Sequence, residues 1–87
     1  MNIEDWRIRI DELNEELIAL LNKRARYATE IGKLKKEKGL PVKDASRENA
    51  VLDRVSELAQ KAGGPFSEDS IRRIFKTIMD ETCLVEE

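Results

Sequence analysis

The 87-residue sequence contains no histidine and only one cysteine. Without histidine, the chain lacks the usual general base of enzymes and the commonest side-chain metal ligand. Its one thiol, Cys83, cannot form an internal disulfide, and this cysteine usage fits a reducing compartment. The sequence therefore predicts a cytoplasmic protein whose function needs neither a bound metal ion nor a histidine base.

Long apolar segments and an excess of one charge are also missing. No apolar run is long enough to cross a bilayer, and the N-terminus lacks the apolar core of a signal peptide. The 16 basic and 18 acidic residues give a formal net charge of −2. We interpret the two signs as mixed along the whole chain, which leaves no basic face for nucleic acid. Neither a membrane nor a nucleic acid is expected as a partner.

What the sequence does contain is amphipathic helix. Hydrophobic residues make up 40% and charged residues 39% of the chain, a balance typical of amphipathic helices rather than of disorder. No segment shows the alternation of a β-strand. The length suits one small core, so we expect a single domain over residues 1–87. The predicted fold class is all-α.

Capping residues and breakers divide the chain into three helices, one long and two shorter. The first should run from about Ile3 to about Lys38, where Gly39-Leu40-Pro41 ends it. The second should begin at Ser46 as its N-cap and end before Gly63-Gly64-Pro65, and Ser67 should cap the third.

The first helix is too long for a compact chain of this size. It would be roughly 50 Å long, whereas a compact domain of 87 residues has a radius of gyration of only about 12 Å. Gly32 indicates a close crossing with another helix. Two shorter helices cannot cover the whole apolar stripe, so we predict an intertwined homodimer. The stripe recurs at steps of three and four, typical of helix packing: Ile3, Trp6, Ile10, Leu13, Leu17, Leu20, Tyr27, Ile31 and Leu34.

Arg24 is the one charged residue on this stripe. A guanidinium stays protonated and is costly to bury without an anionic partner, so an internal carboxylate or a bound anion should satisfy it. Lys35 lies almost three whole turns further on and points the same way. Arg7 faces about a quarter-turn away, and it could reach the equivalent site of an antiparallel partner.

Two further polar clusters lie on the shorter helices. Asp44, Arg47 and Glu48 are grouped at the start of the second helix, while Thr82 and Glu86 lie one turn apart at the end of the third. Singly, these residues are explained by a cap, a local ion pair or a solvated helix end. Taken with Arg24, they predict that a small polyanionic ligand binds inside the helical bundle.

The order and spacing of these residues resemble the all-α chorismate mutase family, and the resemblance covers essentially the whole chain. It implies an isomerase that rearranges chorismate to prephenate, in the biosynthesis of phenylalanine and tyrosine, without a cofactor. It also implies a homodimer of intertwined helices. The residues that carry it are Arg7, Ile10 to Asn14, Leu17, Leu20 to Arg24, Glu30 to Lys35, Pro41-Val42, Asp44, Arg47-Glu48, and the third helix from Ile71 to Glu86.

The resemblance implies that cationic residues hold the substrate. Arg24 and the partner's Arg7 would each bind one of its two carboxylates, because a guanidinium binds a carboxylate with two parallel hydrogen bonds. Lys35 would reach a carboxylate and the ether oxygen. Thr82 would donate a hydrogen bond to a carboxylate from the third helix.

The remaining roles fall to the acidic residues and Arg47. Glu48 would accept the hydrogen bond of the ring hydroxyl, with Asp44 beside it, and Arg47 would belong to the surrounding charges. Glu86 or, with a slip of one residue, Glu87 would face the ether oxygen. Only a protonated carboxyl group can donate a hydrogen bond there, so activity should fall as the pH rises.

Two other functions remain open at this point. An isochorismate pyruvate-lyase shares the fold and most of these charged residues, and the mutase is favoured as the commoner activity of the scaffold. A non-catalytic helical module, for dimerisation or regulation, would instead pair Arg24 internally. Substituting Arg24 would then change stability more than any activity.

Overall fold

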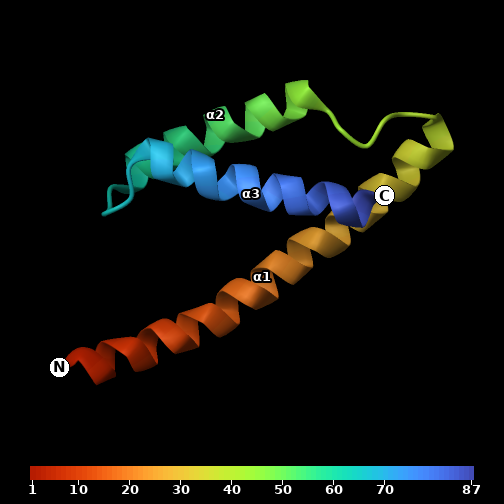
Figure 1. Ribbon diagram of the computed structural model, residues 1–87. Coiled ribbons are helices and arrows are strands. Elements are labelled where there is room, and N and C mark those ends of the chain that lie inside the picture. The colour runs from red at the N-terminus through yellow and green to blue at the C-terminus, as the bar shows by residue number, and fades with distance from the viewer.

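The computed structural model describes residues 1–87, which form three helices and no strand. Helix α1 spans Ile3–Lys38, α2 spans Ala45–Ala62 and α3 spans Glu68–Glu86 (Figure 1). The all-α fold class and the division into one long and two shorter helices are confirmed. None of the three helices combines the length and the apolar composition needed to span a membrane.

Local capping explains both ends of α1 and the start of α3. The Asn2 side chain accepts a hydrogen bond from the backbone N–H of Asp5, whose carboxylate accepts one from the Asn2 backbone N–H, a reciprocal capping box. Helix α1 ends at Gly39, whose φ of 69° is left-handed and costs glycine little. Ser67 caps α3 by accepting from the Ser70 backbone N–H. The predicted bounds of α1 and the predicted cap of α3 are confirmed.

Helix α2 begins near Ser46 as expected, but the predicted N-cap is wrong by two residues. Asp44, not Ser46, is the N-cap, and its Oδ1 accepts a hydrogen bond from the backbone N–H of Arg47 at 3.0 Å. Ser46 lies inside the first turn. Both residue types cap helices well, but a carboxylate also interacts favourably with the positive end of the helix dipole. The helix ends at Ala62, before Gly63, as expected.

Helix α3 packs along α2, and its C-terminal end crosses the second half of α1 (Figure 1). The first half of α1 extends away from both other helices. The chain is accordingly 54 Å in its longest dimension, with a radius of gyration of 15.9 Å. A compact domain of this length would have a radius of gyration of about 12 Å. The expected projection of the long helix is therefore present.

Gly32 lies at the crossing of α1 and α3. A Cβ atom at this position would lie 2.6 Å from the backbone oxygen of Glu86 and 2.9 Å from its Cα atom. Such distances are far below ordinary contact, so a side chain here would push the two helices apart. The predicted close crossing at Gly32 is confirmed.

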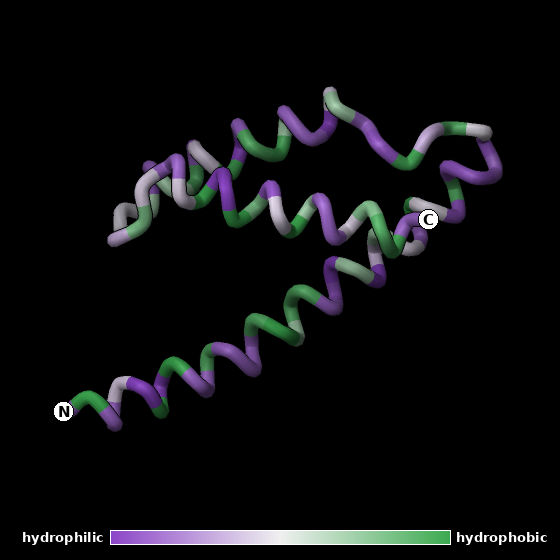
Figure 2. The backbone as a smooth tube through the Cα atoms, viewed as in Figure 1, coloured by the Kyte–Doolittle hydropathy of each residue, from purple (hydrophilic) through white to green (hydrophobic).

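Very little of this chain is buried by the chain itself. Only 3 of 87 residues are buried, namely Ala28, Gly32 and Met79, and all three lie on α1 or α3. Figure 2 shows hydrophobic residues recurring along the whole of α1, including the part that no other helix covers. The exposed large apolar residues of that part are Ile3, Trp6, Ile8, Ile10, Leu13, Leu17, Ile18, Leu20 and Leu21.

Candidate active site

A cavity of about 450 Å³ lies where the end of α3 meets the second half of α1 and the start of α2. Apolar side chains that include Ile31, Val51 and Met79 form part of its wall. The three helices also bring seven of the eight predicted site residues to this wall: Arg24, Lys35, Asp44, Arg47, Glu48, Thr82 and Glu86.

Arg24 reaches into this cavity from α1 and is half-buried. Its Nη1 donates a hydrogen bond to Oγ1 of Thr82 at 2.7 Å, and that hydroxyl donates to the backbone oxygen of Ile78 at 2.6 Å. No carboxylate lies within 4.0 Å of the guanidinium. Because a hydroxyl cannot neutralise a guanidinium, this arrangement leaves the positive charge available to an anionic ligand.

Lys35 links α1 to the connection before α2 and to the end of α3. Its Nζ donates hydrogen bonds to the backbone oxygen of Val42, in the connection after α1, and to Oε1 of Glu86, both at 2.7 Å. The Lys35 and Glu86 side chains are only 18% and 10% exposed. Glu86 thus accepts a hydrogen bond from Lys35, while Glu87 does not line the cavity.

Glu48 presents its carboxylate from the first turn of α2, and its side chain is 14% exposed. Oε2 lies 3.4 Å from Nζ of Lys43, and Oε1 lies 3.4 Å from Nζ of Lys76. Lys76 also donates to Oδ1 of Asp80 at 2.8 Å. The hydrogen bonds to Asp80, and then to Glu48, raise the pKa of Lys76 above its ordinary value.

Asp44 and Arg47 contribute more exposed groups to the wall. The Asp44 carboxylate caps α2, and both residues are exposed. The Arg47 guanidinium forms no ion pair within 4.0 Å, so the local pairing with Asp44 or Glu48 considered from the sequence is absent. Arg47 is therefore a second cation on the cavity wall without an anionic partner.

Arg7 lies outside the cavity of its own chain. Its Nη1 pairs with Oε1 of Glu4 at 3.0 Å, and the Arg7 side chain is 67% exposed. Seventeen residues separate it from Arg24, which is roughly 26 Å of helix. A single chain cannot bring these two arginines to one ligand.

The cavity combines cations with an apolar wall and carboxylates. Arg24, Lys35 and Arg47 supply positive charge, and Glu48 and Glu86 supply hydrogen-bond acceptors. Such a site suits a small apolar ring or chain that carries acidic groups and a hydroxyl. No three side chains among the histidine, cysteine, aspartate and glutamate residues are grouped so that they could hold a metal ion.

Three residues beside the site were not predicted from the sequence, namely Lys43, Lys76 and Asp80. Lys76 and Asp80 lie one turn apart on α3, and this spacing alone predicts only a local helix pair. The contact of Lys76 with Glu48 spans 28 residues and depends on how α2 packs against α3. No signal in the sequence could have identified it.

A family model, two similar proteins and a solved structure that match this chain all carry the name chorismate mutase. The family model described as chorismate mutase type II matches residues 6–87. A bifunctional chorismate mutase/prephenate dehydratase of Neisseria gonorrhoeae is 39% identical over 92% of this chain, and one of Aquifex aeolicus is 31% identical over 94%. The chain spans only 21% and 23% of the lengths of these two relatives.

A solved structure shares both the fold and a substantial part of the sequence. Chorismate mutase (form II) of Thermus thermophilus superposes with a TM-score of 0.88 and 36% identity, over 97% of this chain and 92% of that one. With the same three-helix fold and a family match over nearly all of its residues, the chain belongs to the chorismate mutase type II family.

Proposed function

We propose that this chain is a chorismate mutase, an isomerase that rearranges chorismate to prephenate without a cofactor. The observation that carries the proposal is the meeting of Arg24, Lys35 and Glu48 around one cavity with apolar walls. Cations that hold both carboxylates would select the folded conformer of the substrate. A cation beside the ether oxygen would stabilise the negative charge that develops there as the C–O bond breaks.

The contacts of the ligand-free site suggest which protein group each part of chorismate would replace. One substrate carboxylate would take the place of the Thr82 hydroxyl at Arg24, or share the guanidinium with it. Lys35 would exchange its bond to Glu86 for a substrate carboxylate and the ether oxygen. Glu86 would donate to the ether oxygen only after that exchange, as a protonated acid.

Glu48 is the proposed acceptor for the ring hydroxyl, with Asp44 beside it, and Arg47 adds to the surrounding positive charge. Glu48 and Asp44 belong to the first turn and the cap of one helix, which places both acidic groups at one edge of the cavity.

We further propose that the working unit is a homodimer whose long helices pair antiparallel. The bare apolar face of α1 supports a second copy as its partner, because a stripe of this size is rarely left in water. If the twofold axis of the dimer passes between residues 15 and 16 of the two paired helices, the partner's Arg7 would lie level with Arg24. It would then supply the second carboxylate site.

The charges of α1 support the antiparallel direction. Residues 3–20 contain six acidic and two basic residues, whereas residues 21–38 contain seven basic and two acidic ones. The expectation that the two signs are mixed along the whole chain is therefore wrong for α1. Antiparallel pairing would place the acidic half of each helix near the basic half of the other, and parallel pairing would place like charges together.

The direct test is to incubate the purified protein with chorismate and, separately, with isochorismate, and to identify the products by chromatography. Prephenate from chorismate is the expected result. Salicylate and pyruvate from isochorismate alone would replace the proposal with a lyase. No turnover of either substrate by a folded protein would favour a non-catalytic module. The cytoplasmic location stays a prediction from cysteine usage.

A further inference from the structure

Two lysines approach Glu48 from outside the cavity. The carboxylate oxygens Oε1 and Oε2 lie 3.4 Å from Nζ of Lys76 and of Lys43, and neither lysine lines the cavity. Glu48 itself is 14% exposed and does line it. The carboxylate is thus contacted by cations on its outer side, while it forms part of the cavity wall on the other.

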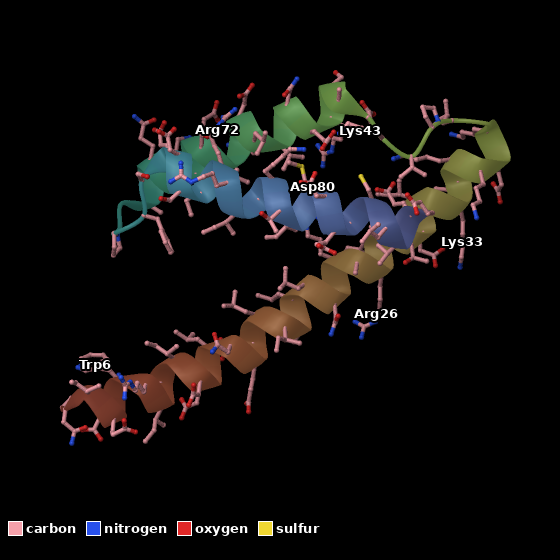
Figure 3. All side chains as sticks on the ribbon, viewed as in Figure 1. Trp6, Arg26, Lys33, Lys43, Arg72 and Asp80 are labelled. Carbon is pink, nitrogen blue, oxygen red and sulfur yellow. The ribbon has the colours of Figure 1, made fainter.

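The two lysines differ in how firmly they are held. Lys43 lies in the connection that leads into α2, its side chain is 67% exposed, and Glu48 is its only ion-pair partner. Lys76 belongs to α3, is 47% exposed, and is also held by Oδ1 of Asp80 at 2.8 Å. Figure 3 shows Lys43 just before α2 and Asp80 on α3. Lys76 is therefore the lysine with a defined position.

We propose that Lys76, held by Asp80, is a positioning residue that orients the Glu48 carboxylate for the ring hydroxyl of the substrate. This inference rests on the proposed function. An ionised carboxylate has about four lone-pair directions, so contact with lysines on one side leaves others free to accept the hydroxyl proton. A group that is already oriented before the substrate binds loses less freedom on binding.

The effect of Lys76 should appear in substrate recognition rather than in folding. Ion pairs between exposed side chains contribute little to stability, and Lys76 is nearly half exposed. The hydroxyl contact is made in both the bound substrate and the transition state. Its weakening should therefore raise KM and leave kcat nearly unchanged.

The experiment compares Lys76→Gln with Lys76→Arg, Glu48→Gln and the double variant K76Q/E48Q. We expect K76Q to lower kcat/KM by about three- to tenfold, chiefly through KM, because a contact with a charged group is weakened. K76R should recover most of this loss. In the E48Q background, K76Q should cause no further loss, since Lys76 acts through Glu48.

Lys33→Gln is the matched control for the loss of one positive charge. Lys33 is 65% exposed, pairs only with Glu30 and lies outside the cavity, so K33Q should retain the wild-type kcat and KM. An equal loss in K33Q would mean that overall charge, not position, matters.

Several results would overturn the positioning role alone. The first is a wild-type kcat/KM for K76Q in a protein that converts chorismate. The second is an equal loss of kcat/KM on adding K76Q to the wild type and to E48Q. The third is a kcat/KM for K76R as low as that for K76Q. Failure of the wild-type protein to convert chorismate would instead remove the proposed function, and the positioning role with it.

Discussion

The two halves of α1 have the same apolar spacing but very different surroundings. The N-terminal half is bare, with Leu13 and Leu17 55% and 54% exposed, whereas the C-terminal half contains Ala28 at 6% and the buried Gly32. The half that α3 crosses also contributes Arg24 and Lys35 to the cavity. One periodic stripe therefore serves two purposes, since it builds the site at one end and leaves an apolar face at the other.

Two hollows, one beside each half of α1, differ in the same way. A broader hollow of about 730 Å³ runs beside residues 1–16, but its lining comes from Met1 and one flank of α1 alone. The smaller cavity is lined from all three helices and contains seven of the eight predicted site residues. Convergence of separate elements, rather than size, distinguishes a candidate site from an uncovered helix.

The largest expected effect comes from substituting one arginine in each half of α1, Arg24 in the covered half and Arg7 in the bare half. Arg24→Ala and Arg7→Ala should each lower kcat/KM on the order of 10³-fold, because each removes a proposed charged partner of a substrate carboxylate. The two inactive chains, mixed and allowed to exchange, should recover about a quarter of wild-type activity. Half of the dimers are then mixed, and each holds one complete site. The measurement is prephenate formation before and after exchange.

Circular dichroism should show that both arginine variants keep their helices, and mass spectrometry of one isotope-labelled chain should confirm that subunits exchange. Complete exchange without any recovered activity would contradict a site shared between subunits.

The second prediction concerns Gly32, where α3 crosses the C-terminal half of α1. Gly32→Ala should destabilise the fold by about 1–3 kcal/mol, because its Cβ atom would meet the Glu86 backbone at 2.6 Å. The end of α3 must then shift, so kcat/KM should fall by roughly tenfold, as expected when catalytic groups are misplaced. Urea unfolding and steady-state kinetics measure the two effects. Asn22→Ala, at an exposed position of the same helix, is the control for helix propensity.

A smaller effect tests Glu86 at the far end of the covered half. If a protonated Glu86 donates to the ether oxygen, the wild-type rate should fall several-fold as the pH rises, because an ionised carboxylate cannot donate. Glu86→Gln can donate at every pH, so its rate should stay level. The measurement is kcat against pH. Glu87 lies outside the cavity, so the control variant Glu87→Gln should keep the wild-type pH profile. If Glu86→Gln also kept that profile, Glu86 would be excluded as the donor.

The smallest expected effect tests whether the charge difference between the two halves of α1 contributes to dimerisation. Glu12→Lys places a cation in the acidic half, and it should weaken dimerisation about two- to fivefold at low salt. At high salt the difference should disappear, because ions screen exposed charges. Sedimentation equilibrium measures the dissociation constant. Glu57→Lys, an exposed acidic residue on α2, makes the same charge change and should leave dimerisation unaltered.

Much of the fold could be predicted because its signals are local. Helix bounds depend on caps and breakers within a few residues, and Gly39 and Ser67 act as expected. The error at Ser46 arose because two good capping residues lie two positions apart, and the choice between them depends on the path of the connection. The close crossing at Gly32 could also be inferred, because glycine inside a helix is unfavourable without such a reason.

Seven of the eight residues predicted for the site line one cavity, but the contacts they make could not be predicted from the sequence. Helical spacing placed Arg24 and Lys35 on one face, which is a local property. The pairing of Arg24 with Thr82 joins residues 58 apart, and that of Lys35 with Glu86 joins residues 51 apart. These contacts depend on the angle and depth at which α3 crosses α1, which no local pattern encodes.

The scarcity of buried residues has a thermodynamic consequence. With 3 of 87 residues buried, one chain removes too little apolar surface from water to offset the entropy of ordering it. Folding and association should then be a single equilibrium, in which two unfolded chains become one folded pair. Its midpoint depends on how much protein is present, so the melting temperature should rise with protein concentration.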